Sequence, residues 1–416
     1  MSLEVVALQQ HWRRSLGILW VALFVVQVGF SLIMPFLSLY VQEMGVVSAH
    51  AVELWSGAIF SANFITAAIF LPIWGAVADR VGRRAMMLRA AFGMGLVVGF
   101  MGLATHPWQL VLLRLLQGTT VGLVPAAIAY MAGITPKEHT GYVLGTLQAG
   151  TTAGTVIGPL VGGLLATFIG HRPIFFLTGL ACILGGVVIL FFIPADKVSE
   201  TSRRERTSVI ADLRLVGRNP ALVAMMVVLM LTTFSAMNAE PIIPLYLQTL
   251  ALPAGYLSFL SGLVFSATGI ADILASPFLG RRGDRYGYKK VLLISLAGSA
   301  VMYTAQAFAL TWWHVLILRF LQGIFMGGAL AAGNALISLS VPATFQGRAF
   351  GVSMAAMQIG NFLGPVTGGA ISAWLGYRAV FPITGLLRMI NFVWVYIVIH
   401  EAPAPRRLGD EAAAAD

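Results

Sequence analysis

Apolar stretches of about twenty residues or more recur along nearly the whole of this 416-residue chain. A stretch of about 20 apolar residues is long enough to cross the hydrocarbon core of a bilayer as a helix. Only 10% of the residues are charged, whereas soluble domains carry about 25%. The chain is therefore predicted to be an all-α membrane protein. A soluble enzyme, a nucleic-acid-binding domain and a disulfide-stabilised domain are all poor interpretations.

The apolar stretches divide into twelve predicted transmembrane helices, six on each side of a polar linker. These spans cover residues 15–40, 54–78, 85–104, 108–130, 141–167, 173–193, 221–247, 257–279, 289–309, 313–335, 347–372 and 379–399. The predicted domains are a six-helix bundle over 1–193, a linker over 194–220, a second six-helix bundle over 221–400 and a disordered tail over 401–416. The first stretch is too long for a cleaved signal sequence, so we expect it to remain as the first span.

Basic residues lie almost entirely on one side of this threading. Twenty lysines and arginines fall on that side, and only Arg172 and Arg378 fall on the other. Loops rich in lysine and arginine stay in the cytoplasm. Both termini are therefore predicted to be cytoplasmic, in a multi-pass protein of the inner membrane. The net charge of +10 then reflects topology and not nucleic-acid binding. The basic linker either rests on anionic headgroups of the lipid bilayer or is solvated, and the sequence leaves both open.

The two halves repeat one another at an offset of 205 or 206 residues. GAVADRVGRR at 75–84 returns as GRRGDRYGYK at 280–289, LRLLQG at 113–118 as LRFLQG at 318–323, and GPLVGG at 158–163 as GPVTGG at 364–369. Two similar six-span bundles in parallel orientation are typical of a transporter that holds its substrate between the halves.

These motifs resemble those of the major facilitator superfamily. GAVADRVGRR matches the superfamily's loop signature, Gly-x-x-x-Asp-Arg/Lys-x-Gly-Arg-Arg/Lys. The LRLLQG arginine and the Gly-Pro-x-x-Gly-Gly run resemble the drug:proton antiporter branch. More narrowly, GFSLIMPFLSLYV, LWSGAIFS and MMLRAAFGMG resemble the MdtG-type multidrug exporters. The resemblance implies two pseudo-symmetric six-helix bundles that export drugs.

The resemblance assigns the loop between the second and third spans to a cytoplasmic gate. The residues carried over are Gly75, Asp79, Arg80, Gly82 and Arg83, with Asp284 and Arg285 in the second copy, where Tyr288 replaces an arginine. Contact with the eleventh span near Gly347 and Arg348 is expected to close this gate. The alternative is that the basic residues are only an anchor at the headgroups.

Glycines lie four residues apart along the fifth span and therefore form one stripe on a helix. Small residues in such a stripe allow neighbouring helices to approach closely. The antiporter motif that the resemblance implies comprises Gly154, Gly158, Pro159, Gly162 and Gly163. A role in export and a kinked packing seam without a directional role are both compatible with this pattern.

Charged residues at membrane depth are costly, by about 2.5–3.5 kcal/mol each on insertion scales, and they usually face a partner or a wet cavity. Among them, Arg114, Arg319, Glu240 and Asp272 are the predicted proton-coupling candidates, while Arg89 is predicted to be structural. In many relatives of the antiporter branch, the fourth-span arginine works beside an acid in the first span. Residues 15–40 contain no carboxylate.

The 206-residue offset suggests where the missing acid lies. Glu240 is the counterpart of Met34, and Arg319 is the counterpart of Arg114. We expect Glu240 and Arg319 to form the acid–arginine pair in the second half. Because burial favours a neutral carboxyl group and a nearby arginine favours a charged one, a movable arginine would make proton binding depend on conformation. Asp272 is the alternative proton carrier or an attractor for cationic drugs, and a static ion pair with Arg388 is a third interpretation.

The predicted substrate cavity lies between the first, seventh, eighth and eleventh spans. Its predicted lining is Phe30, Met34, Met237, Asn238, Phe265, Met354 and Gln358. No nucleotide loop, zinc-ligand spacing or nucleophile motif is present, so we expect no catalytic site, metal or cofactor, and transport would draw on an ion gradient. The predicted function is export of diverse apolar or amphipathic small molecules in exchange for protons, by a protein expected to be a monomer. An importer of a small metabolite and a non-transporting membrane receptor are the alternatives.

Overall fold

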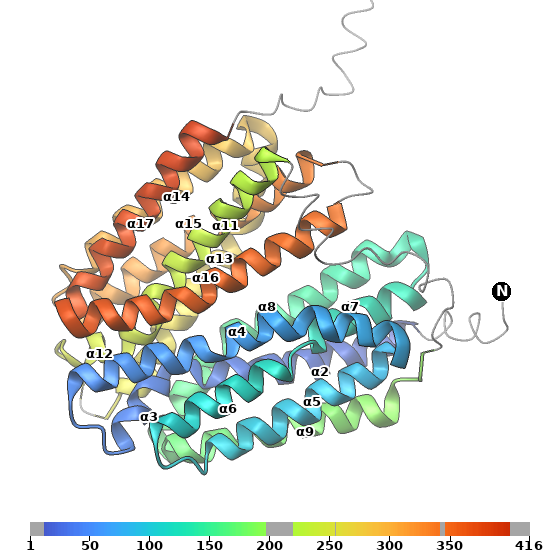
Figure 1. The fold of residues 1–416 in the computed structure, drawn as a ribbon, viewed down its shortest axis with the longest axis horizontal. Coiled ribbons are helices and arrows are strands. Elements are labelled where there is room, and N and C mark those ends of the chain that lie inside the picture. Colours follow the sequence, from blue (N-terminus) through green and yellow to red (C-terminus); the bar gives the residue numbers. More distant parts are fainter. Residues whose placement is uncertain (1–11, 197–218, 254, 342–345, 400–416) are drawn as a thin grey trace, which may run out of the picture.

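The computed structural model describes residues 12–196, 219–253, 255–341 and 346–399, and these form an almost entirely helical protein (Figure 1). The first half contains α2 (Trp12–Leu32), η1 (Met34–Phe36), α3 (Leu37–Glu43), α4 (Ala49–Val81), α5 (Arg83–Met101), α6 (Pro107–Thr119), α7 (Leu123–Ile134), η2 (Lys137–His139), α8 (Thr140–Ile169) and α9 (His171–Phe192). The second half contains α11 (Pro220–Ala239), η4 (Glu240–Ile242), α12 (Ile243–Gln248), α13 (Leu257–Tyr286), α14 (Tyr288–Gln306), α15 (Trp312–Leu339), α16 (Gln346–Leu375) and α17 (Tyr377–Val398).

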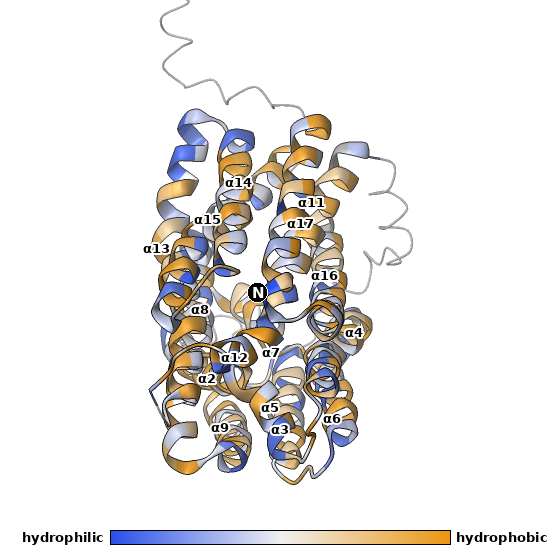
Figure 2. Cartoon of the chain, turned by 90° about the vertical axis from the view of Figure 1, so that its left-hand side faces the viewer, coloured by the Kyte–Doolittle hydropathy of each residue, from blue (hydrophilic) through white to orange (hydrophobic). Residues whose placement is uncertain are grey.

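These helices account for all twelve predicted spans. Within the described part of the chain, ten helices are long and apolar enough to cross a membrane. The remaining two spans are α14, with 19 residues, and α16, with 30. Apolar residues, orange in Figure 2, recur along the helices of both halves. The prediction of an all-α fold with six helices on each side of the linker is confirmed. The basic residues of the linker itself lie outside the described residues.

The two halves share local structure that the repeat predicted. Pro35 and Pro241 lack the N–H group that an α-helix needs, and each lies in a short 3₁₀ turn that interrupts the first or the seventh span. After this turn, the hydroxyl of Tyr40 donates to the carbonyl of Ala104, and the hydroxyl of Tyr246 donates to the carbonyl of Ala309, its counterpart at the offset of 205. Equivalent positions of the two sequences therefore have equivalent backbones and contacts.

The fourth span differs from its counterpart because it is broken, which the sequence analysis did not predict. Helix α6 ends at Thr119 and α7 begins at Leu123, with Gly122 at a φ of +119° between them. The Trp74 indole donates to the Thr119 carbonyl, and the Arg89 guanidinium donates to the carbonyls of Thr119 and Val121. These side chains satisfy backbone groups that the break releases. Arg89 therefore has the structural position that was predicted for it.

The glycine stripe of the fifth span is a packing seam against the first span. A Cβ atom on Gly158 would lie 2.7 Å from the carbonyl oxygen of Val28, and one on Gly162 would lie 2.1 Å from that of Leu32. The second half repeats the seam between α16 and α11, where a Cβ on Gly368 would lie 1.8 Å from the Asn238 carbonyl oxygen. Only glycine permits these backbone approaches.

The neighbouring positions of the motif face the other half of the molecule. A Cβ on Gly163 would lie 2.3 Å from the carbonyl oxygen of Ser258 in α13, and one on Gly262 would lie 2.2 Å from that of Pro159. One segment of α8 therefore packs both within its own half and across the junction between the halves.

The halves meet at one end of the bundle, and their ribbons diverge toward the other end (Figure 1). We call the end that carries α3 and α12 the far end, and the end that carries the loops at 75–84 and 280–289 the motif end. Contacts between the halves run mainly through α4 with α16 and through α8 with α13. Toward the far end, the hydroxyl of Ser38 donates to the carbonyl of Pro241 at 2.6 Å, and the side chains of Gln42 and Gln248 bond one another.

Candidate functional site

A buried acid–arginine pair lies at the start of η4, in the second half. Arg319 Nη2 donates to Glu240 Oε1 at 2.8 Å. The Arg319 side chain has no exposed surface, whereas that of Glu240 is 15% exposed. The structure thus brings together the two residues that the sequence analysis paired. Their role in proton coupling stays a prediction.

Arg319 is held in place by a hydrogen-bonded network behind the pair. Its Nη1 atom donates to Gln322 Oε1 at 3.3 Å, and Gln322 Nε2 donates to the Tyr303 hydroxyl at 2.7 Å. Gln306 Nε2 also donates to Gln322 Oε1. The Phe265 ring lies beneath the guanidinium, with its centre 5.9 Å away. These partners are neutral. Within this network, Glu240 therefore supplies the only negative charge next to Arg319.

A third arginine adjoins this network. Arg388 of α17 is fully buried, and its guanidinium carbon lies 5.8 Å from the centre of the Tyr303 ring. Its Nη2 atom lies 3.3 Å from the sulfur of Met326. Among the described residues, Arg388 and Asp272 form no ion pair. Asp272 accepts a hydrogen bond from the Ser276 hydroxyl one turn along α13, at 2.9 Å.

The first half has the same arginine but no acid beside it. Arg114 is 2% exposed, and its Nε atom donates to the Ile59 carbonyl while Nη1 donates to Gln117 Oε1. Its Nη2 atom lies 4.0 Å from the sulfur of Met34. Met34 therefore stands beside Arg114 as Glu240 stands beside Arg319. The counterpart relation inferred from the 206-residue offset is present in the contacts.

The predicted cavity residues differ in their surroundings. Phe30, Met34, Met237, Phe265 and Gln358 are partly exposed, and Met354 is 60% exposed. Asn238 is fully buried, where its amide group donates to Thr367 and accepts from Thr384. In this conformation, Asn238 thus contacts other side chains of its own half and no open space. Binding of substrate by these residues stays a prediction.

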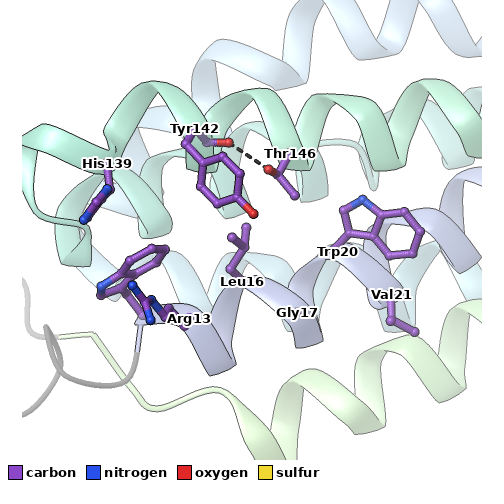
Figure 3. A pocket seen from close by; sticks show the side chains of 9 residues that line it. Arg13, Leu16, Gly17, Trp20, Val21, His139, Tyr142 and Thr146 are labelled. Carbon is purple, nitrogen blue, oxygen red and sulfur yellow. Dashed lines mark hydrogen bonds between the residues drawn. The ribbon is translucent and has the colours of Figure 1, made fainter.

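A groove at the motif end lies between α2 and α8 (Figure 3). It has a volume of about 700 Å³ and is lined by Trp12, Arg13, Leu16, Gly17, Trp20, Val21, His139, Tyr142 and Thr146. None of the predicted cavity residues lines it. Aromatic side chains and an arginine at its rim make this groove mostly apolar with one cationic edge.

The first gate loop is tied to the end of the sixth span. Gly82 has a φ of +100°, and the backbone N–H groups of Arg83 and Arg84 donate to the carboxylate of Asp196 at 2.7 and 3.0 Å. A carboxylate at the start of α5 accepts hydrogen bonds from N–H groups that have no partner within the helix. Its negative charge also interacts favourably with the positive end of the helix dipole. Asp196 was assigned only to the linker, so its role was missed. Arg83 also donates to the carbonyl of Ala129.

The second gate loop is held by a different contact, made by the tyrosine that replaces the arginine. The Tyr288 hydroxyl donates to the carboxylate of Asp284, while Arg80 and Arg285 are exposed. A Cβ on Gly75 or on Gly280 would meet no other described residue within 4 Å. Gly75 and Gly280 therefore face open space, whereas Gly82 and Gly283 are packed against Asp196 and Tyr288. The side chains of Asp79 and Arg348 lie outside the described part, so the expected contact with the eleventh span is not described.

The far end contains a carboxylate that the sequence analysis also missed. Glu53 is only 4% exposed, and the side chains of Ser372 and Tyr377 from the second half lie against it. Near it, His50 Nδ1 is 3.0 Å from the Ala373 carbonyl oxygen. On the other side of the far end, His171 lies between Glu43 and Ser258, at 2.7 and 3.0 Å.

Comparison with known proteins agrees with this geometry. The family model described as Major Facilitator Superfamily matches residues 19–264 and 255–415. Multidrug resistance protein MdtG of Escherichia fergusonii is 39% identical over 400 residues, which cover 96% of this chain and 98% of that protein. The MdtG of Citrobacter koseri is 38% identical over 387 residues, covering 92% and 94%.

Solved structures share the fold at low sequence identity. A bacterial homologue of the human lysosomal transporter Spinster, in an inward-facing and occupied conformation, has a TM-score of 0.78 at 14% identity and covers 93% of this chain and 97% of its own. The nucleoside transporter NupG has a TM-score of 0.77 at 15% identity, with coverage of 93% and 98%. The helical spans, the repeated halves and the matched motifs lead to one conclusion: the chain belongs to the major facilitator superfamily and is a multi-pass membrane transporter.

Proposed function

We propose that this transporter exports diverse apolar or amphipathic small molecules from the cytoplasm in exchange for protons, by alternating access across the inner membrane. The motif end faces the cytoplasm in this proposal, and the far end faces outward. The transporter works as a monomer, draws its energy from the proton gradient and needs no bound cofactor.

The Glu240–Arg319 pair is the observation that carries the proposal. Its carboxylate is partly exposed and its arginine is fully buried, so a proton can reach Glu240 while Arg319 keeps a fixed charge nearby. Protonation of Glu240 removes the attraction to Arg319, and a change of conformation that separates the two groups favours protonation. Proton binding and conformation are then linked, as antiport requires. Asp272 of α13 is the second candidate carboxylate, because it is an acidic group at membrane depth that packs against Gly327 of α15, and its only hydrogen bond among the described residues comes from the neutral Ser276 hydroxyl.

The conformation fits one state of such a cycle. The halves are joined toward the far end, and Gly75 and Gly280 of the gate loops face open space at the motif end. With the motif end in the cytoplasm, this is an inward-facing state that admits substrate from the cell. The Spinster homologue with a similar fold was itself solved inward-facing.

The substrate class rests on the relatives and on the cavity residues. The curated relatives are multidrug resistance proteins. Partly exposed methionine and phenylalanine side chains from both halves suit ligands of varied shape, because methionine is flexible and polarizable. The partly exposed Glu240 gives such a surface one acidic group.

The test is uptake of a fluorescent lipophilic cation into everted membrane vesicles, with and without an inwardly acidic proton gradient. We expect the wild type to accumulate the dye only with the gradient. Glu240→Gln should reduce this uptake by at least about tenfold, because a neutral side chain cannot exchange a proton. Asp272→Asn, tested in parallel, identifies which carboxylate couples, and Glu138→Gln is the control because Glu138 is exposed at the motif end.

Two results would contradict the proposal. Transport by Glu240→Gln and by Asp272→Asn with the wild-type dependence on the gradient would exclude both carboxylates as coupling groups. Movement of dye in the opposite direction would favour an importer. Absence of movement for cationic, neutral and anionic dyes alike would favour a receptor that does not transport.

A further inference from the structure

Glu53 is a carboxylate enclosed between the two halves at the far end. It lies in the second turn of α4 and is 4% exposed. A Cβ on Gly369 of α16 would lie 2.6 Å from the Glu53 carbonyl oxygen, and one on Gly57 would lie 2.5 Å from that of Pro365. The backbones of α4 and α16 are therefore in direct contact around this side chain, and the enclosure exists only while the far end is closed.

The groups that face Glu53 carry no fixed positive charge. From the second half, the Ser372 side chain of α16 and the Tyr377 phenol of α17 lie close to the carboxyl group, and the Ser372 hydroxyl is buried without a hydrogen-bond partner in the described part of the chain. From its own helix, His50 lies one turn away, with Nδ1 bound to Ala373 and its ring against Trp374. Among the described residues, no lysine or arginine forms an ion pair with Glu53. This sets Glu53 apart from Glu240, which has Arg319.

A buried carboxyl group without a cationic partner favours its neutral, protonated form. In that form it can donate one hydrogen bond and accept others from neighbouring hydroxyl groups. If α4 separates from α16 and α17, water reaches the carboxyl group and its charged form becomes favourable. A proton therefore binds more tightly when the far end is closed, and by reciprocity a bound proton favours closure.

We propose that Glu53 is a second proton-binding site, at which a proton taken from outside the cell holds the far end closed. This inference rests on the proposed function, because it requires that the far end opens to the outside of the cell during transport. The proton on Glu53 returns to the side from which it came when the far end reopens. Glu53 thus sets the external acidity at which the far end opens, whereas the proton that drives export crosses on a different carboxylate.

The experiment measures the far end directly, without transport. Spin labels are attached to Leu103→Cys and Leu310→Cys, which are 63% and 69% exposed in far-end loops of the two halves. The native Cys182 is fully buried and is not expected to react. Distance distributions from double electron–electron resonance are recorded in lipid nanodiscs between about pH 5 and about pH 9, the range over which a buried carboxyl group can titrate.

For the wild type, we expect the ratio of closed to open far ends to fall with rising pH, by up to about tenfold per pH unit, as one linked proton requires. Glu53→Gln should stay closed and change its ratio less than about twofold over the same range, because the amide cannot ionise. Glu53→Asp should keep the response, because aspartate can still ionise. If the role of the side chain were purely structural, Glu53→Gln, which has the same length as glutamate, would behave more like the wild type than Glu53→Asp.

The outcomes separate this proposal from the proposed function. A wild-type far end that stays closed at every pH, or a Glu53→Gln variant that responds like the wild type, would overturn it. In the second case the response would belong to His50 or His171, and His50→Gln or His171→Gln would abolish it. Glu240→Gln should keep the distance response while losing gradient-driven uptake. Loss of the response in Glu240→Gln as well would mean that Glu53 does not act separately.

Discussion

Glu240 and Met34 occupy equivalent positions beside equivalent arginines, yet only one of them can bind a proton. Arg114 is surrounded by neutral groups, the Ile59 carbonyl, the Gln117 amide and the Met34 sulfur. Arg319 has the Glu240 carboxylate. The first half therefore has an arginine without an acidic partner among the described residues at this depth, whereas the equivalent arginine of the second half is paired with a carboxylate. In these residues the pseudo-symmetry is structural, and the proposed chemistry is not symmetric.

This asymmetry can be reversed by exchanging the acid between the halves. In Met34→Glu/Glu240→Gln, the new carboxyl group takes the place of the Met34 sulfur. That sulfur lies 4.0 Å from Arg114 Nη2, so the carboxyl group would lie next to the guanidinium. We expect the double variant to recover part of the gradient-dependent dye uptake that Glu240→Gln loses. The control is the same double variant with Arg114→Gln, which should not recover it. Equal recovery without the arginine would show that the pair is not the functional unit.

Residues differ in how far the sequence reveals their role. The Glu240–Arg319 contact was predictable because the repeat relates Arg319 to Arg114 and places Glu240 opposite Met34. Glu53 was missed because the second span was predicted to begin at residue 54, so its carboxylate was counted with the loop. The helix begins at Ala49 instead, and the other half of the molecule buries Glu53. Burial by a partner several hundred residues away leaves no local signal.

At the scale of single helices, hydropathy predicted where each span lies. It did not predict where the helices end or that the fourth span is broken. Helices α4 and α13 extend to Val81 and Tyr286, beyond the predicted ends at 78 and 279, because a helix can continue into water where charged residues replace apolar ones. The break between α6 and α7 had only a weak signal, a glycine at 122 followed by Pro125. The backbone there is stabilised by Trp74 and Arg89. Both residues lie in other spans, so no pattern within 107–134 could predict the break.

Helix α8 offers a test of what the glycine motif does. Gly163→Ala would place a Cβ 2.3 Å from the Ser258 carbonyl oxygen in the other half, so the far end cannot close fully around it. We expect dye uptake to fall by at least about tenfold while the protein still folds, because the clash lies between the halves. Gly145→Ala in the same helix meets no neighbour within 4 Å and should transport normally. Unchanged transport by Gly163→Ala would restrict the motif to a tolerant packing role. Thermal unfolding of both variants checks their folding.

At the scale of the whole molecule, the two halves are predicted to separate at the far end during each cycle. Gln42 and Gln248 are related by the repeat and bond one another across the junction, at 2.9 and 3.2 Å. A disulfide cross-link in Gln42→Cys/Gln248→Cys should abolish dye uptake, and a reducing agent should restore it. The two single cysteine variants serve as controls. Full transport by the cross-linked protein would exclude alternating access through this end.

The break in the fourth span also has a consequence for how the protein enters the membrane. The carbonyl groups of Thr119 and Val121 would be unsatisfied in lipid, at a cost of several kcal/mol each. Their partners, Trp74 and Arg89, belong to α4 and α5, which are synthesised earlier. When the ribosome delivers residues 107–134, the donors are thus already available in the nascent chain. We therefore expect the broken span to be stable in the membrane only once the second and third spans are in place, so that the first half inserts in the order of its sequence.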